Sequence, residues 1–165
     1  MFREMRRKKQ LMSTELTEEV LSRCTNGVLA CLGDEGYPYA VPVSYAYYNN
    51  KIYFHSGKAG HKVDSLENYE KVSFAVVDED KIISSEYTSY FRSVIAFGKA
   101  RFVEGDEWHQ GFKALVEKYS FDQPEDKKHK EITGCTQSHI IAIDIDHLTG
   151  KEAIEFVRMR QEGKL

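Results

Sequence analysis

Apolar residues recur at a helical spacing in three stretches of the chain. The first begins near Thr17, whose hydroxyl can cap a helix, and the Asn26-Gly27 pair predicts where that helix ends. A short amphipathic segment covers residues 63–69, and a longer helix is predicted over residues 106–119. The longer helix carries an apolar stripe that we expect to face the core: Trp108, Phe112, Leu115, Val116 and Tyr119.

Six further segments have the composition of strands, and in most of them apolar and polar residues alternate. These segments are residues 27–32, 39–48, 51–56, 71–78, 90–104 and 139–147. Asn49-Asn50 predicts a hairpin turn because asparagine tolerates positive φ, and Gly98 predicts a kink in the longest strand. Short turns between consecutive strands indicate a mostly antiparallel sheet. Six strands with three helices indicate a small barrel whose ends or gaps the helices cover.

Pro42 interrupts the hydrogen bonding of the strand over residues 39–48, because proline has no backbone N–H. That strand is therefore predicted to be irregular or at a sheet edge near Pro42, with backbone groups free for a ligand. Two polar stretches, residues 80–89 and 121–137, are predicted as loops, the second with room for a helical piece. A doubly wound fold is disfavoured, because strands and helices do not alternate and no glycine-rich dinucleotide fingerprint is present.

The length of 165 residues and a hydrophobic fraction of 41% predict one domain over residues 1–165. Residues 1–12 form a basic arm and residues 156–165 a tail. A net charge of −3 argues against a general nucleic-acid binder. The basic run is either a solvated arm or an arm that folds over an anionic ligand or a partner subunit. Its cationic residues are Arg3, Arg6, Arg7, Lys8 and Lys9.

The cysteines and the apolar runs predict a cytoplasmic protein. Cys24, Cys31 and Cys135 are odd in number and form no Cys-x-x-Cys motif, so we expect buried thiols rather than disulfides or a zinc site. The scattered histidines show no metal-ligand spacing, so no metal site is predicted. No segment approaches the length of a membrane span, and the N-terminus lacks the apolar region of a secretory signal.

The stretch over residues 53–62 carries the main candidate chemistry. A strand leads into a turn that holds Lys58, His61 and Lys62, where Gly57 and Gly60 permit close backbone approach. Cations and backbone donors at a helix start suit a phosphate group. The alternative is an exposed basic turn without a ligand.

His55 ends the strand just before this turn. Imidazoles exchange protons near neutral pH, so His55 could donate a proton to a bound molecule, or it could instead hydrogen-bond to a neighbouring strand. Arg92, followed by Ser93, could pair with an anion or with an acidic residue of a neighbouring subunit, or it could form a plain surface salt bridge. No Ser-His-Asp or Cys-His arrangement is recognisable.

Several segments together resemble the FMN-binding split-barrel superfamily that includes pyridoxamine 5′-phosphate oxidase, and more narrowly its nitroimidazole-resistance (Nim) branch. The matching segments are GVLA (27–30), GYPYAVPVSY (36–45), IYFHS (52–56), GHKVD (60–64), FRSVIAFGKA (91–100) and IDIDHLTGK (143–151). The resemblance implies a mostly β (α+β) fold, a six-stranded antiparallel split β-barrel. It also implies a homodimer that binds FMN in grooves at the subunit interface.

The resemblance also implies roles for individual residues. His55 would be the catalytic residue beside the flavin, and His61 and Lys62 would hold the phosphate, with Lys58 nearby. The residues implied to bind the cofactor are Pro42, Val43, Ser44, Phe54, His55, Ser56, Lys58, His61, Lys62, Arg92 and Ser93. The basic residues that bind substrate near the C-terminus of true pyridoxamine-phosphate oxidases have no clear match here.

We therefore expect an FMN-dependent oxidoreductase that reduces an electron-poor small molecule such as a nitroaromatic. Two alternatives remain open from the sequence. The chain could be a flavin-binding module without catalytic activity, or a split barrel that uses haem or a deazaflavin.

Overall fold

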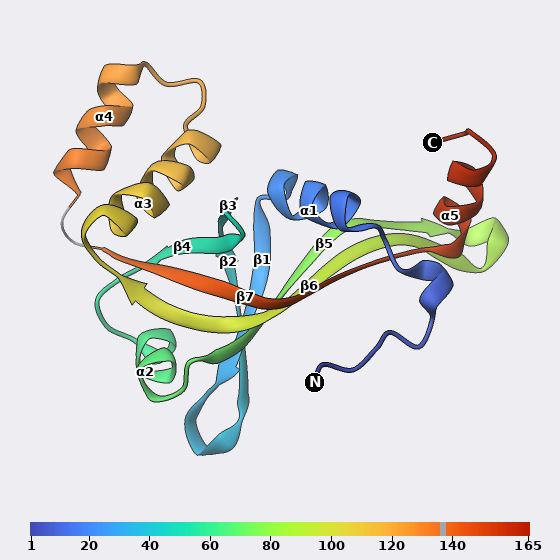
Figure 1. Cartoon of the computed structure of the whole chain (residues 1–165), viewed down its shortest axis with the longest axis horizontal. Helices are drawn as coiled ribbons and strands as arrows, with labels where there is room; N and C mark the ends of the chain where they lie inside the picture. The colour runs from blue at the N-terminus through green and yellow to red at the C-terminus, as the bar shows by residue number, and fades with distance from the viewer. Residues whose placement is uncertain (136–137) are drawn as a thin grey trace.

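The computed structural model describes residues 1–135 and 138–165, whose strands form one antiparallel sheet (Figure 1). The strands are β1 (Asn26–Leu32), β2 (Pro38–Ser44), β3 (Ala46–Tyr48), β4 (Lys51–Ser56), β5 (Lys71–Ile83), β6 (Thr88–Val103) and β7 (His139–Glu152). The α-helices are α1 (Thr14–Arg23), α2 (His61–Asn68), α3 (Gly105–Tyr119), α4 (Glu125–Gly134) and α5 (Ile154–Gln161). Short 3₁₀ turns cover Lys8–Gln10, Asp34–Gly36 and Ser84–Glu86.

The strand order is β2-β1-β5-β6-β7-β4-β3, so the two edge strands are neighbours along the chain. Only Tyr45 separates β2 from β3, and the sheet therefore curls until its two edges meet at that residue. This arrangement is consistent with a split barrel. The described residues form seven strands rather than the predicted six, because the segment predicted as one strand over residues 39–48 is divided at Tyr45.

Tyr119, at the end of α3, satisfies the backbone of Tyr45 where the strand is broken. The Tyr45 N–H donates to the Tyr119 hydroxyl over 2.9 Å, and this hydroxyl lies 2.9 Å from the Tyr45 carbonyl and also reaches the Thr25 carbonyl. Pro42 pairs with Val28 within edge strand β2. The edge position predicted near Pro42 is therefore confirmed, while the break lies three residues further on.

The apolar faces of the strands enclose the main core. Tyr45 and Phe54 are fully buried there, the Tyr45 ring meets Phe74 edge-on, and the Tyr45 hydroxyl donates to the Leu21 carbonyl of α1. A second, smaller core lies between the sheet and α3. Gly111 permits this contact, because a Cβ at position 111 would lie 2.6 Å from the ring of Tyr53.

The structure confirms the predicted turn and kink but not the predicted helix cap or the number of helices. Asn49 and Asn50 both adopt positive φ in the β3–β4 hairpin, and the β6–β7 register shifts at Gly98, so both turn signals are confirmed. The predicted cap is wrong: Ser13 caps α1 by accepting from the Leu16 N–H, and Thr17 lies inside the helix. The structure also has more helices than the predicted three, since α4 occupies part of the 121–137 stretch and α5 extends into the predicted tail.

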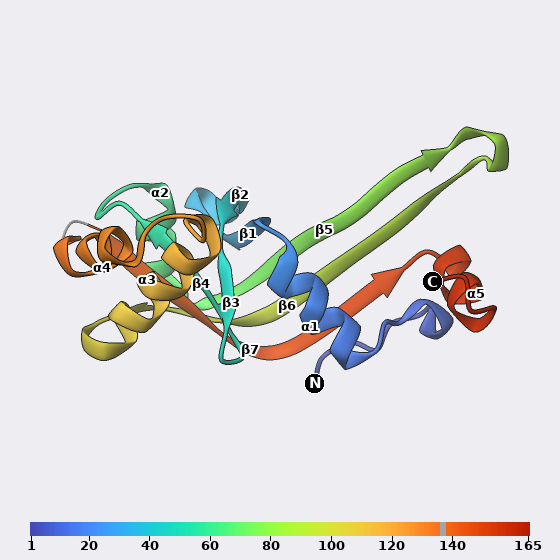
Figure 2. The same cartoon turned by 90° about the horizontal axis from the view of Figure 1, so that it is seen from above.

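The β5–β6 hairpin extends far from the rest of the sheet (Figure 2). Both strands are longer than predicted, because residues 80–83 and 88–89 continue the ladder although their sequence lacks an apolar face. In this two-stranded region Ile82 and, at the tip, Tyr87 are largely exposed.

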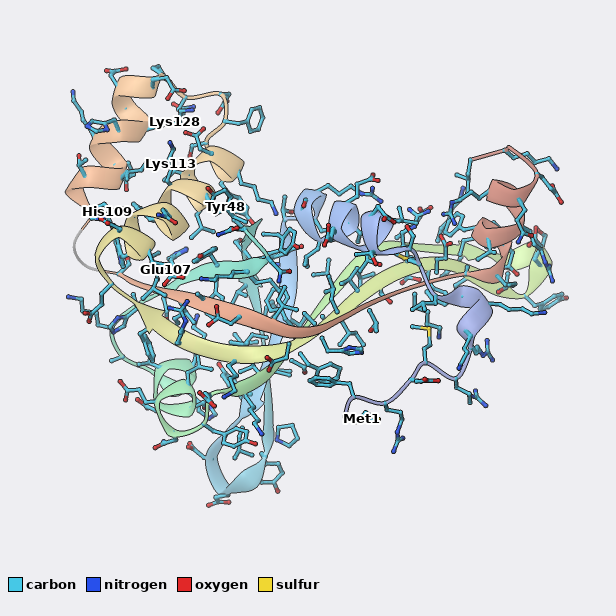
Figure 3. The ribbon with its side chains drawn as sticks, viewed as in Figure 1. Met1, Tyr48, Glu107, His109, Lys113 and Lys128 are labelled. Atoms are coloured by element: carbon cyan, nitrogen blue, oxygen red, sulfur yellow. The ribbon has the colours of Figure 1, made fainter. Side chains whose placement is uncertain are left out.

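An ion network holds the start of α3 against the sheet. Figure 3 labels Glu107 near the start of α3. Arg101 of β6 donates to Glu107 of α3 over 2.7 Å and to Asp144 of β7 over 2.6 Å, and Lys51 of β4 lies 2.7 Å from the Glu107 carboxylate. These hydrogen bonds, above all the one from Arg101, lower the pKa of Glu107 to about 2. The N-terminal end of α3 is thus fixed by charge, and its C-terminal end by Tyr119.

Replacing Tyr119 with Phe should destabilise the fold, because it leaves the Tyr45 N–H and carbonyl without their shared partner. Leaving such groups unpaired costs about 1–3 kcal/mol. Urea denaturation of the two proteins measures the difference. Tyr37→Phe is the matched control, since the Tyr37 side chain is 71% exposed. Equal losses of stability in both variants would show that the hydrogen bonds between Tyr119 and Tyr45 contribute nothing to the free energy of unfolding.

Candidate functional site

His55 lines an open cavity between the sheet and the α3–α4 hairpin. The cavity has a volume of about 500 Å³. Ser44 and His55 line it from the sheet, and α3 contributes Phe112, Val116 and Tyr119. The His55 side chain is exposed and makes no hydrogen bond or ion pair within the described part of the chain. An imidazole in this position is available to a ligand rather than used by the fold.

Strand alternation separates the predicted neighbours of His55 from it. Phe54 and Ser56 point into the barrel and are almost fully buried, while His55 points outward. In β2, Val43 likewise points inward, and the exposed Pro42 and Ser44 lie on the outside. Of these predicted site residues, the structure brings only Ser44 and His55 together at the cavity.

A gap in the sheet lies beside these residues. In the described residues, β2 pairs with β1 alone, and residues 54–56 of β4 pair with β7 alone. The edges of β2 and β4 that adjoin the gap therefore offer main-chain donors and acceptors. Free backbone groups were predicted from Pro42, and the structure places them at the edges of β2 and β4.

Lys62 sits in the first turn of α2 and is half-buried, with its Nζ 5.7 Å from the centre of the Phe54 ring. Burial lowers the pKa of Lys62, and the described residues supply no carboxylate partner for it. Gly60 precedes the helix at φ +123°, which permits the tight turn, and no side chain caps the first-turn N–H groups. Lys58 is exposed in the same turn. This donor set fits the phosphate of a nucleotide-like cofactor.

His61 contacts the β1–β2 turn instead of the cationic turn before α2. Its ring stacks on Tyr39 with centroids 4.1 Å apart, and its Nε2 accepts from the Asp34 N–H over 3.4 Å. The Asp34 carboxylate lies 3.8 Å away, and Gly33 leaves room for the ring. The structure therefore uses His61 to hold the β1–β2 turn against α2, beside rather than within the Lys58–Lys62 donor set.

Arg92 is buried in an ion network of the β5–β6 hairpin. It donates to Asp78 over 3.1 Å, its Nε lies 3.6 Å from the Glu152 carboxylate, and it covers the Phe156 ring of α5 at 4.7 Å. Arg92 pairs with Glu152 on β7, whereas His55 pairs with Ile140 on the same strand. Twelve residues separate those two β7 positions, a path of about 40 Å. Arg92 and Ser93 therefore lie far from His55 within one copy of the chain.

Several residues at the cavity were predicted only as core, or not at all. Phe112, Val116 and Tyr119 were assigned to an apolar stripe, and Lys127 and Lys128 to a charged loop. No local signal distinguishes a core residue from a cavity wall, because the difference depends on where α3 and α4 settle on the sheet.

The described residues contain no group of three or more His, Cys, Asp or Glu side chains able to hold a metal ion. Cys31 is buried and Cys24 half-buried, and burial raises the pKa of Cys24 to about 11. Among the described helices, none combines the length and the apolar character needed to cross a membrane.

Comparison with known proteins establishes the family. A family model described as pyridoxamine 5′-phosphate oxidase matches residues 13–152, so the chain belongs to that family. The uncharacterized protein RA0666 of Rhizobium meliloti (strain 1021) is 27% identical over 153 residues, which cover 87% of this chain and 95% of that protein.

Solved structures agree on the fold. A Bacteroides thetaiotaomicron protein provisionally assigned to 5-nitroimidazole antibiotic resistance superposes with a TM-score of 0.71 at 22% identity, over 86% of each chain. The FAD and haem binding protein of Mycobacterium smegmatis superposes with a TM-score of 0.69 at 18% identity, over 88% of this chain and 73% of that one. Identities this low establish a shared fold alone, and that fold is consistent with a split barrel.

Proposed function

We propose that this protein binds FMN and reduces an electron-poor small molecule, such as a nitroaromatic, with His55 as the proton donor. The observation that carries the proposal is the exposed His55 ring, which has no hydrogen-bond or ion-pair partner among the described residues, in a largely apolar cavity beside the sheet gap. Family membership and flavin-binding neighbours of the same fold support the cofactor class.

The donor set of the α2 turn supports a phosphorylated cofactor. Lys62 is a half-buried cation without a carboxylate partner in the described chain, and an anion beside it would offset the cost of its burial. Lys58 and the first N–H groups of α2 add further donors. The free edges of β2 and β4 lie between this turn and the cavity, so main-chain groups can hydrogen-bond to the polar edge of a flavin ring.

The chemistry requires one hydride and one proton for each two-electron step. A reduced flavin, when bound, supplies the electron pair as hydride, and an external two-electron donor such as reduced nicotinamide restores it. His55 in its protonated form donates a proton to a nitro oxygen. One N–O bond breaks, that oxygen leaves as water, and a nitroso product forms, so that R–NO₂, H⁻ and H⁺ give R–NO and H₂O. Because His55 is exposed, solvent returns the proton.

We also propose that the protein acts as a homodimer. Laterally paired residues on the outer face of the sheet form a row of small and apolar side chains. The row consists of Pro42, Val28, Ala75 and Ile95. Beside it Phe97 is 40% exposed, although Phe2 lies against it. A second copy would cover this face, and we propose that its Arg92, which lies far from His55 within one copy, approaches the His55 of the partner.

Replacing His55 with Gln or Ala should lower the turnover of a nitroimidazole by about 100-fold, because general acid catalysis is lost. FMN affinity should stay within about threefold, since His55 holds no cofactor phosphate in this proposal. Steady-state kinetics with added imidazole provide the sharper test, because free imidazole should partly restore the Ala variant. His109→Gln, at an exposed position of α3, is the control. Equal turnover in all proteins would remove His55 from the mechanism.

Replacing Lys62 with Met should raise the Kd for FMN by about 10-fold or more, the loss expected when a charge-assisted hydrogen bond disappears. Titration that follows flavin fluorescence measures this Kd, and inorganic phosphate should compete in the wild type. Lys113→Met, at an exposed lysine of α3, should change nothing. Chromatography of the cofactor released by acid should show FMN. Release of FAD or haem instead, or an unchanged Kd, would contradict the assignment.

Sedimentation at micromolar concentration should show a dimer, and Ile95→Lys should shift it to a monomer because a charge would enter the buried row. Phe121→Lys adds the same charge at a 78% exposed position after α3 and should leave the dimer intact. A monomeric wild type would refute the proposed assembly.

A further inference from the structure

The α4 helix is held to α3 by an ion pair of a buried lysine. Among the described residues it contributes nothing to either hydrophobic core, and its one buried residue is a lysine, Lys128, which is 6% exposed. Lys128 lies 2.7 Å from Glu117 of α3 and 2.5 Å from Glu125. Figure 3 shows Lys128 where α4 lies beside α3. A charge clamp, rather than apolar burial, thus holds α4 over the cavity.

The barrel does not depend on α4 to close. Figure 1 shows α4 beyond α3, the helix that packs on the sheet. What α4 does cover is the cavity with His55, to which it contributes Lys127, Lys128 and Glu131. A helix that belongs to neither hydrophobic core of the described residues, and that lines the cavity at His55, is placed to contact a ligand.

The walls of the cavity define the chemistry of that ligand. Phe112, Leu115 and Val116 of α3 present apolar surface, whereas Ser44 and His55 place polar groups together at the sheet. The charged groups here carry one net negative charge, which disfavours an anion: Lys128 is paired with two glutamates, and Lys127 and Glu131 are of opposite sign, one turn apart on α4. A volume of about 500 Å³ is at the size of sites for small organic ligands.

The cavity and the cationic turn also lie on different faces of β4. The His55 side chain points out of the barrel toward α3, whereas Lys62 packs on Phe54, whose ring points inward. A cofactor phosphate anchored at Lys62 therefore leaves the α3–α4 side of His55 open to a second molecule.

We infer that the α3–α4 hairpin forms the binding site of the electron acceptor, and that this site takes a neutral, planar heteroaromatic ring with its polar substituent directed at Ser44 and His55. This inference rests on the proposed function and adds the location and the charge class of the acceptor. Val116 is the residue that sets the size of the site, because it is buried and lines the cavity yet belongs to the buried set of neither core.

The test is acceptor binding in the absence of a reductant, measured by equilibrium dialysis of the oxidised protein with and without FMN. The probes are 2-methyl-5-nitroimidazole, which is neutral, and 4-nitrobenzoate, an anion of similar size. The neutral probe should bind at least 10-fold more tightly than the anion. Val116→Phe, which fills the cavity, should weaken the neutral probe at least 10-fold while the Kd for FMN stays within about threefold.

A second variant tests the same site without adding bulk to the cavity. Lys128→Met breaks the clamp and leaves two glutamates that are 41% and 84% exposed, so the barrel should unfold at an unchanged urea concentration. It should still weaken the neutral probe, because α4 no longer closes the cavity. Gln110→Phe is the matched control: it places the same ring on an exposed side of α3 that does not line this cavity.

The outcomes separate this inference from the proposed function. Unchanged binding of the neutral probe in both Val116→Phe and Lys128→Met, or tighter binding of the anion, would overturn the inference even if FMN and turnover are as proposed. Loss of probe binding in both variants supports it. If that loss occurs in a protein that takes up no flavin, the acceptor site stands and the proposed function fails.

Discussion

The hydrogen bonds between the Tyr119 hydroxyl and the backbone of Tyr45 are the contact on which the rest of the structure depends. A strand that passes from one edge of the sheet to the other must break, and the break exposes one N–H and one carbonyl at a buried residue. The Tyr119 hydroxyl accepts from the first, and its single proton lies within reach of both the Tyr45 and the Thr25 carbonyls. The same contact fixes the end of α3, and with it one wall of the cavity at His55.

Strand alternation then places successive residues of β4 on the inner or the outer face of the sheet. Phe54 and Ser56 belong to the interior, His55 belongs to the outside, and the turn that follows carries Lys62 back against the ring of Phe54. One short segment thus places an imidazole and a half-buried cation on opposite faces of the same strand. In the proposed function, that separation would let a phosphorylated cofactor and a second small molecule approach His55 from different directions.

The long β5–β6 hairpin carries a cluster of charged side chains that lies far from the cavity. Arg92 pairs with both Asp78 and Glu152 beside α5, and Arg23 and Arg160 add further cations to these carboxylates. These charged side chains stabilise the hairpin, about 40 Å along β7 from the cavity. A buried cluster of this kind is costly to break, because each remaining charge would lose its partner. The apolar outer face of the sheet lies between this hairpin and the sheet gap, and it is the surface that a second copy would cover in the proposed dimer.

The sequence by itself determined most of the strands, the Asn49-Asn50 turn, the bulge at Gly98 and the edge position of Pro42, because period, turn chemistry and a missing N–H are local properties. It also pointed to His55 and to the lysines of the next turn. Only the tertiary structure decided that the strand breaks at Tyr45, that His61 is used by the β1–β2 turn, and that α3 and α4 enclose a cavity. Those features depend on contacts between residues far apart in the chain, such as Tyr119 with Tyr45, and no local pattern encodes where two distant segments meet.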